Sequence, residues 1–301
     1  MIIDIEQAFG LPPVAEAIGP FCTADFYRVV SRHDDGEPLP VGRADAFIPL
    51  RRVDDVVLFA GDPDVTDYHT PFGDGCEDLI AEIAEEHSPQ RFVLDSLPEE
   101  AAKPLASGLQ EAGWVVESRT HEVTAVLDLP DTFDDYLTAI GKKERHEMRR
   151  KRRRYESAVG PVVHETHRGP GWAFEEFVRL HRMAEGEKGQ FLTEERLEFF
   201  RCLAELDGWR LDLLKTPDGA ASAIVFGFSD PSGYYLYNSA YDPALAESSP
   251  GVVLLGSMIE LAIEENAPRF DFLKGDETYK FRLGARPRPL IEISASPGPR
   301  S

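Results

Sequence analysis

Hydrophobic positions in the first 128 residues follow two spacings, one typical of strands and one typical of helices. Short apolar runs rich in β-branched residues and bounded by Gly, Pro or Asp predict strands. They fall at residues 46–50, 56–60, 92–94, 114–117 and 123–129. Between them, apolar residues three and four apart predict helices over 76–86 and 98–112. The alternation predicts an α/β first half.

The pattern changes at Leu129, where we expect the boundary between two domains, 1–128 and 129–301. Asp131 or Thr132 can cap a helix whose apolar residues recur at i, i+4 and i+7 from Phe133. We expect one long helix within 131–159 that starts with an apolar face and ends basic. Gly160 and the proline after it end the pattern.

In the second half, turn sequences clearly separate the predicted helices and strands. Two amphipathic helices, one spanning 174–181 and one starting at Thr193, precede three strands. The turn sequences TPDG and DPSG separate these strands, which predicts an antiparallel meander. The strands are expected at 209–215, 221–228 and 234–241, followed by a helix at 252–265, a strand at 269–273 and segments at 279–283 and 290–293.

Composition narrows the class of protein. Hydrophobic residues make up 42% of 301 residues, which excludes a disordered polymer. The longest stretch without Asp, Glu, Lys or Arg, residues 248–259, has 12 residues, whereas a membrane-spanning helix needs about 20. We therefore expect no membrane insertion. An acidic N-terminus unlike a secretory signal, together with only three cysteines, predicts a cytoplasmic protein.

Charge is distributed unevenly along the chain. The formal net charge is −22, which argues against DNA binding by the molecule as a whole. Yet residues 142–154, KKERHEMRRKRRR, carry nine basic side chains against two acidic ones. Two interpretations stay open: a solvated helix face that packs against the protein's own acidic surface, or a surface that recruits a phosphate-bearing partner.

Common catalytic and cofactor motifs are absent from the sequence. We find no GxGxxG, GxxxxGK[ST], GxSxG, HExxH or CxxC, so dinucleotide, P-loop, α/β-hydrolase and common zinc sites lack support. No metal site is expected.

Two segments of the second half combine strand ends with polar chemistry. Directly before a predicted helix lie Ser249, Pro250 and Gly251. Either the free N–H groups at this helix start bind phosphate, or the proline only starts the helix. After the strand at 269–273 come Lys274, Asp276, Glu277, Tyr279, Lys280 and Arg282. This cluster is either a salt-bridged turn or a ligand site at a strand end. Alternation along the strand predicts Phe270 and Phe272 on one face, and Asp271 on the other, paired with Lys274 or Lys280.

The block FDFLKGDETYKFRLGA, with the element order from 174 to 293, resembles the GNAT-fold acyltransferases of the CelD/BcsL-like group, relatives of the Fem-type aminoacyl transferases. LTAIGKKERHEMRRKRRRYE is similar to the basic helix of that group, and TDYHTPF, residues 66–72, to another of its segments. The resemblance implies an α/β fold with mixed sheets and tandem GNAT-like domains. The first would be degenerate, and the second would keep the acyl-donor site.

That resemblance implies direct attack by an amine or hydroxyl on an acyl-CoA thioester. Asp271 or Asp276 would be the base, Tyr279 or Tyr241 would protonate the thiolate, and Lys274 and Lys280 would orient the substrate. Donor contacts are expected from Ser239, Ala240, Tyr241, Ser249, Gly251 and Val252. The loop departs from the R/Q-x-x-G-x-G/A pattern of the fold: its basic residue and second glycine are missing, and Glu247 would repel phosphate.

The sequence therefore predicts an acyltransferase that uses acetyl-CoA or another acyl-CoA, with a small-molecule or saccharide acceptor. Two alternatives stay open. One is Fem-like transfer from aminoacyl-tRNA, in which the basic helix would contact phosphates. The other is a non-catalytic scaffold or sensor in surface-polysaccharide assembly.

Overall fold

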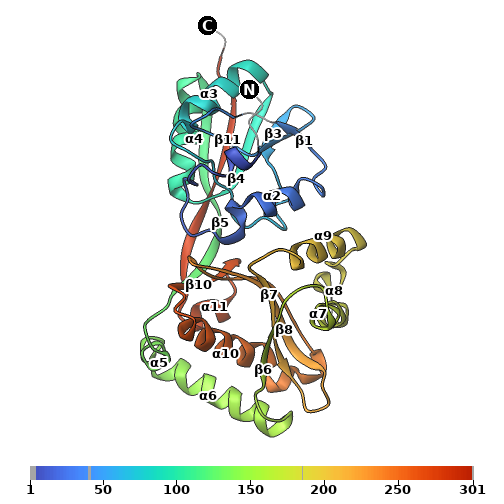
Figure 1. Ribbon diagram of the computed structural model, residues 1–301. Coiled ribbons are helices and arrows are strands. Elements are labelled where there is room, and N and C mark those ends of the chain that lie inside the picture. Colours follow the sequence, from blue (N-terminus) through green and yellow to red (C-terminus); the bar gives the residue numbers. More distant parts are fainter. Residues whose placement is uncertain (1–4, 40–41, 185, 300–301) are drawn as a thin grey trace. The chain divides into compact units, whose positions relative to one another are not determined.

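The computed structural model describes residues 5–39, 42–184 and 186–299. Contacts between Cα atoms divide the chain into two compact units, Met1–Thr124 with Pro287–Ser301 (unit 1) and Ala125–Arg286 (unit 2) (Figure 1). Unit 1 thus includes the C-terminal strand, which the sequence analysis had placed in the second domain. Among the described residues, no helix has the length and apolar character needed to cross a bilayer.

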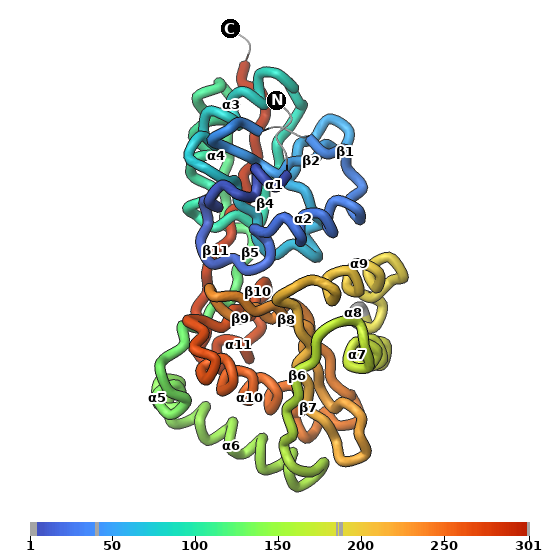
Figure 2. Tube along the Cα trace, in the orientation of Figure 1, coloured from blue at the N-terminus to red at the C-terminus, as the bar shows by residue number. Residues whose placement is uncertain are grey.

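Unit 1 is an α/β structure with strand order β1-β2-β3-β4-β11-β5. β1, β2 and β3 are antiparallel, β3 and β4 are parallel, and β11 is antiparallel to β4. Figure 2 shows the C-terminal strand returning beside β4. The strands are β1 (Glu37–Leu39), β2 (Leu50–Val53), β3 (Val56–Phe59), β4 (Arg91–Leu97), β5 (Trp114–Asp128) and β11 (Arg286–Pro297). The helices are α1 (Ile5–Ala8), η1 (Gly19–Cys22), α2 (Ala24–Val30), α3 (Cys76–His87) and α4 (Glu99–Glu111).

Unit 2 contains the predicted meander, with strand order β10-β9-β8-β7-β6. β6 to β9 are antiparallel, and β9 and β10 are parallel. The strands are β6 (His164–His167), β7 (Trp209–Lys215), β8 (Ala221–Asp230), β9 (Gly233–Tyr241) and β10 (Arg269–Lys274). The helices are α5 (Phe133–Ala139), α6 (Gly141–Ala158), α7 (Trp172–Met183), α8 (Glu187–Gln190), α9 (Glu194–Ala204), η2 (Pro243–Ser248), α10 (Pro250–Glu264) and α11 (Thr278–Arg282).

Helices cover both faces of the unit 2 sheet because side chains alternate along its strands. Ala223 and Val225 of β8 lie in one core cluster with the apolar residues of α10. Phe226 points to the opposite face, where its ring lies 5.7 Å from the ring of Phe177 on α7. Phe270 and Phe272 of β10 join the α10 cluster, which confirms that they share a face.

Several predictions of where a helix or strand begins and ends are wrong, because a backbone conformation or a run of polar residues is not evident from the apolar pattern. The expected long helix is two helices, α5 and α6, because Gly141 has φ +83°. Thr132 caps α5 by accepting a hydrogen bond from the N–H of Asp135 at 3.2 Å. The strands expected at 114–117 and 123–129 are one strand, β5, and the segment at 279–283 lies mostly in the short helix α11.

Candidate functional site

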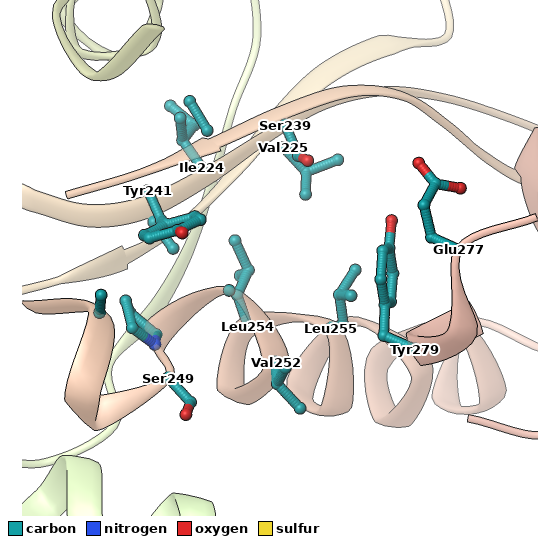
Figure 3. Close-up of a pocket in the computed structure, with 15 residues that line it drawn as sticks. Ile224, Val225, Ser239, Tyr241, Ser249, Val252, Leu254, Leu255, Glu277 and Tyr279 are labelled. Atoms are coloured by element: carbon teal, nitrogen blue, oxygen red, sulfur yellow. The ribbon is translucent and has the colours of Figure 1, made fainter. Parts of the chain in front are cut away.

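A cavity of about 370 Å³ opens in unit 2 between the C-terminal half of β9 and the first turns of α10 (Figure 3). Apolar groups line most of it, and the polar groups come from β9, from the turn before α10 and from the segment that leads into α11. The lining residues are Ala223, Ile224, Val225, Ser239, Ala240, Tyr241, Ala246, Ser249, Pro250, Gly251, Val252, Leu254, Leu255, Glu277 and Tyr279.

The two parallel strands beside this cavity separate along their length. β10 pairs with β9 at Phe270↔Tyr234 and Asp271↔Tyr235, while β9 continues to Tyr241. On its other edge, β9 stays paired with β8 as far as Tyr241. The N–H of Asp242 donates to the carbonyl of Ser222, so alternation directs the N–H groups of Ser239 and Tyr241 to the open edge. This edge offers backbone donors to a ligand.

The turn before α10 exposes the start of that helix. Ser249 adopts a left-handed conformation with φ +57°, and Pro250 occupies the first helical position. The first bond of the helix runs from the N–H of Val253 to the carbonyl of Ser249, at 3.2 Å. The N–H groups of Gly251 and Val252 precede it, in the turn where helix N–H groups lack partners within the helix. This end of the helix favours an anion.

The segment between β10 and α11 directs Glu277 toward the cavity. Gly275 has φ +112°, and a Cβ there would lie 2.3 Å from a carboxylate oxygen of Glu277. The Nζ of Lys280 donates to the carbonyls of Leu273 and Gly275, both at 3.3 Å, and pairs with Glu277 at 3.0 Å. Lys280 is buried, so its ammonium group holds the turn together and orients the Glu277 carboxylate.

Two tyrosines face the same space from opposite ends. Figure 3 shows the Tyr279 hydroxyl pointing into the cavity beside Glu277, with Tyr241 at the far end. Burial is the main cause that raises the pKa of Tyr279 well above its usual value. Its hydroxyl is therefore protonated at neutral pH and can donate a proton. Tyr241 is 45% exposed.

The structure brings most of the residues expected from the sequence into one place. Those that line the cavity are Ser239, Ala240, Tyr241, Ser249, Gly251, Val252 and Tyr279. The other four, Asp271, Asp276, Lys274 and Lys280, do not line it. Asp271 is buried and accepts a hydrogen bond from the N–H of Leu273 at 2.8 Å, and Asp276 is exposed.

Two details differ from the expected interactions. Lys280 pairs with Glu277 instead of Asp271, because the turn at Gly275 folds its side chain back onto the strand end. Glu247 is exposed and lies outside the lining, so its charge does not enter the cavity. The residue that sequence reasoning missed is Glu277, although it belongs to the polar cluster after β10.

A buried charge network supports the strands that carry the site. Asp212 is fully buried on β7 and binds Arg210 at 2.8 Å, the hydroxyl of Tyr234 at 2.9 Å and His164 at 3.0 Å. Burial by itself would raise the pKa of Asp212, but the hydrogen bond with His164 and the charge of Arg210 outweigh it and lower the pKa to about 2. Arg210 also pairs with Glu265, directly after α10, at 2.9 Å. The network ties β6, β7 and β9 to the end of α10.

Across the described ranges, no three His, Cys, Asp or Glu side chains are grouped so that they could hold a metal ion.

Comparison with known proteins gives this geometry a family context. Residues 142–281 match the family model described as an acetyltransferase (GNAT) domain. No curated protein matches the chain in sequence.

Solved structures resemble the chain over nearly its whole length. FemX has 13% identity and a TM-score of 0.63, with 97% of this chain and 96% of that chain covered. L-PGS from Bacillus licheniformis has 13% identity and a TM-score of 0.57, with 91% and 92% covered. A tandem GNAT protein from the clavulanic acid biosynthesis pathway has 14% identity and a TM-score of 0.51, with 99% and 96% covered. At these identities the likeness establishes the fold.

The finer resemblance to the CelD/BcsL-like group stays a prediction, as does the degenerate character of the first domain. The mixed α/β architecture expected from the sequence is confirmed. The chain has the fold of tandem GNAT proteins, and the match of its residues 142–281 to an acetyltransferase (GNAT) domain supports a transferase.

Proposed function

We propose that the protein transfers an acyl group from an acyl-CoA to an amine or hydroxyl acceptor by direct attack. One observation carries the proposal: a single cavity is bounded by the open edge of β9, the first turn of α10, a carboxylate and a protonated phenol. These are the groups that a thioester donor and an attacking nucleophile need within one space.

The donor would lie along β9 with its phosphates at α10. The N–H groups of Gly251 and Val252 would hold phosphate oxygens, where the helix dipole favours negative charge. The N–H groups of Ser239 and Tyr241 at the open edge would polarise the thioester carbonyl. Ala240 lies between these two residues, and its N–H points toward β8 by alternation, so it offers no donor at the open edge.

We assign the proton transfers to Glu277 and Tyr279. The acceptor nitrogen or oxygen attacks the thioester carbon, and its proton passes to the Glu277 carboxylate as the carbon–sulfur bond breaks. The Tyr279 hydroxyl donates its proton to the departing thiolate. Asp271 and Asp276, the bases expected from the sequence, lie outside this space, and Glu277 takes that role in the proposal.

Calorimetric titration with acetyl-CoA tests the donor site. Gly251→Pro removes an N–H donor from the first turn, so we expect its affinity to fall at least about tenfold, the loss of one charge-assisted hydrogen bond. Gly251→Ala is the matched control: it keeps the donor, and its Cβ would lie 3.8 Å from the Tyr241 ring, an ordinary contact. Wild-type protein that binds no acetyl-CoA would overturn the proposal and favour a non-catalytic scaffold.

A second candidate is transfer from aminoacyl-tRNA, which the exposed Lys, Arg and His side chains of α6 favour. Lys142, His146, Arg149 and Arg153 are exposed and recur at i, i+4, i+7 and i+11 on this helix, so they form one stripe. FemX and L-PGS share the fold. Affinity for tRNA would fall by orders of magnitude between about 50 and 200 mM salt, whereas affinity for acetyl-CoA would change much less. A charged tRNA that replaces acetyl-CoA as donor would select this candidate.

A further inference from the structure

We propose that Arg154, on α6, supplies the cation that binds the diphosphate of the donor at the first turn of α10. The inference rests on the proposed acyl-CoA site and adds a residue from outside the loop that the fold normally uses. Three observations lead to it: the charge of the cavity lining, the position of α6 and the pairing of its arginines.

The cavity itself offers no positive side chain to a phosphate. Among its lining residues the one charged group is Glu277, at the end away from the start of α10 (Figure 3). The preceding turn, η2 with Ser249, contains Glu247 and no Lys or Arg. Backbone N–H groups alone would have to balance two negative charges of a diphosphate, so a cation from another element is needed.

Helix α6 lies along α10 within unit 2 (Figures 1 and 2). A Cβ built on Gly256 would lie 3.1 Å from the Cε of Met148, which shows how closely the two helices approach. Arg152 reaches Glu260 of α10 at 3.9 Å. These contacts pack α6 along the middle of α10, and α6 also contacts η2, which directly precedes α10.

Arg154 is the basic residue of α6 that reaches the turn before α10. Its Nη2 donates to the Oγ of Ser249 at 3.4 Å. Figure 3 shows the Ser249 hydroxyl pointing away from Tyr241, so Arg154 approaches this turn from the side opposite Tyr241. The hydrogen bond therefore places the guanidinium at Ser249, two residues before Gly251 in the first turn of α10.

The guanidinium of Arg154 keeps most of its donors available. Its side chain is exposed, and no described carboxylate lies within ion-pair distance of it. Two other arginines of α6 are paired with carboxylates, Arg150 with Glu147 at 2.7 Å and Arg152 with Glu156 at 3.3 Å. A guanidinium offers five N–H donors in a fork that matches phosphate geometry. One is used by Ser249, and the rest can bind the diphosphate.

Titrations of variants with three donors test this role. Arg154→Ala should lower the affinity for acetyl-CoA and for acetyl-3′-dephospho-CoA equally. The expected loss is about 10- to 100-fold, the range for a charge-assisted hydrogen bond. For acetyl-pantetheine as the donor substrate, which has no phosphate, the KM of Arg154→Ala should equal that of wild type. Arg154→Lys should recover part of the affinity. Arg150→Ala is the matched control, because it removes the same charge from an exposed position on α6, where the guanidinium pairs with Glu147, and should change affinity less than about twofold.

The outcomes separate this inference from the function on which it rests. Wild-type protein that binds no acetyl-CoA overturns the proposed function and the role of Arg154 together. If Arg154→Ala keeps the wild-type affinity, or loses no more of it than Arg150→Ala does, the role of Arg154 alone is overturned. A loss seen with acetyl-CoA but not with the dephospho donor overturns the assignment to the diphosphate. Thermal midpoints equal to wild type establish that both variants are folded.

Discussion

Replacing Asp212 by asparagine should destabilise unit 2 strongly, because Asp212 is the centre of the buried network behind the site. The carboxylate accepts hydrogen bonds from Tyr234, Thr166 and Arg210, and it binds His164. Asparagine keeps one acceptor oxygen and removes the charge. Arg210, which is 3% exposed, would then keep a single carboxylate partner, Glu265, at the surface.

The magnitude follows from the pKa of the buried carboxyl group. Its lowering from 3.8 to about 2 corresponds to about 2 kcal/mol in favour of the folded state. Removing one partner of a buried ion pair costs about 3–5 kcal/mol in measured cases, since the other charge is left buried. We therefore expect Asp212→Asn to lower the free energy of unfolding by about 3 kcal/mol or more at pH 7.

Chemical denaturation followed by circular dichroism measures this loss, and its pH dependence gives a second check. The pKa of Asp212 is lower in the folded state than in the unfolded state. Its contribution to stability is therefore fully present above about pH 4 and disappears as the pH falls toward 2. The difference in the free energy of unfolding between wild type and Asp212→Asn should therefore narrow over that pH interval. Glu265→Gln, at a partner side chain 43% exposed, is the control and should cost less than about 1 kcal/mol. An Asp212→Asn variant within about 0.5 kcal/mol of wild type at pH 7 would refute the reasoning.

Three other substitutions and one labelling experiment test separate parts of the account. Glu277→Gln should lower kcat for acetyl transfer by about 10²- to 10³-fold with little change in the Kd for acetyl-CoA, and an unchanged kcat would exclude it as the base. Tyr279→Phe should slow turnover about tenfold or more with the same donor affinity, and equal rates would remove its role as acid. Gly227→Ala should cost about 1–3 kcal/mol in thermal or chemical unfolding, because its Cβ would lie 2.2 Å from the hydroxyl of Tyr234. Burial raises the pKa of Cys76 to about 12, so iodoacetamide at pH 8 should leave it unmodified in the native protein, and rapid labelling would contradict its burial.

Strands separated by specific turn sequences could be predicted closely from the sequence. The meander of β7, β8 and β9 matches within two residues, because TPDG and DPSG force chain reversals and apolar residues predominate in the three strands. Thr193 caps α9 as expected, accepting a hydrogen bond from the N–H of Arg196. In these places local propensity and tertiary packing agree.

Long-range pairing could not be read from the same pattern. The middle of β5, residues 118–122, is polar and exposed, so no alternation marks it as a strand. β11 joins β4 in unit 1 through pairs such as Ala295↔Phe92, a contact between segments about two hundred residues apart that no local signal encodes.

The candidate site shows the same division between local and distant information. A helix start after Ser249 and a strand end at Tyr241 are local features, and the predicted residues there line the cavity. Which carboxylate after β10 faces it depends on the left-handed turn at Gly275, and that turn selects Glu277 over Asp276. The contribution of Arg154 depends on the packing of α6 along α10, which sequence spacing does not reveal.

A crystal structure of the protein with a bound, non-reactive acetyl-CoA analogue tests the central claim most directly. The account predicts the diphosphate within hydrogen-bond distance of the N–H groups of Gly251 and Val252 and of the Arg154 guanidinium. It predicts the sulfur within reach of the Tyr279 hydroxyl, and the acyl carbonyl at the open edge of β9. An analogue bound away from β9 and α10, or no bound analogue at saturating concentration in solution, would contradict it.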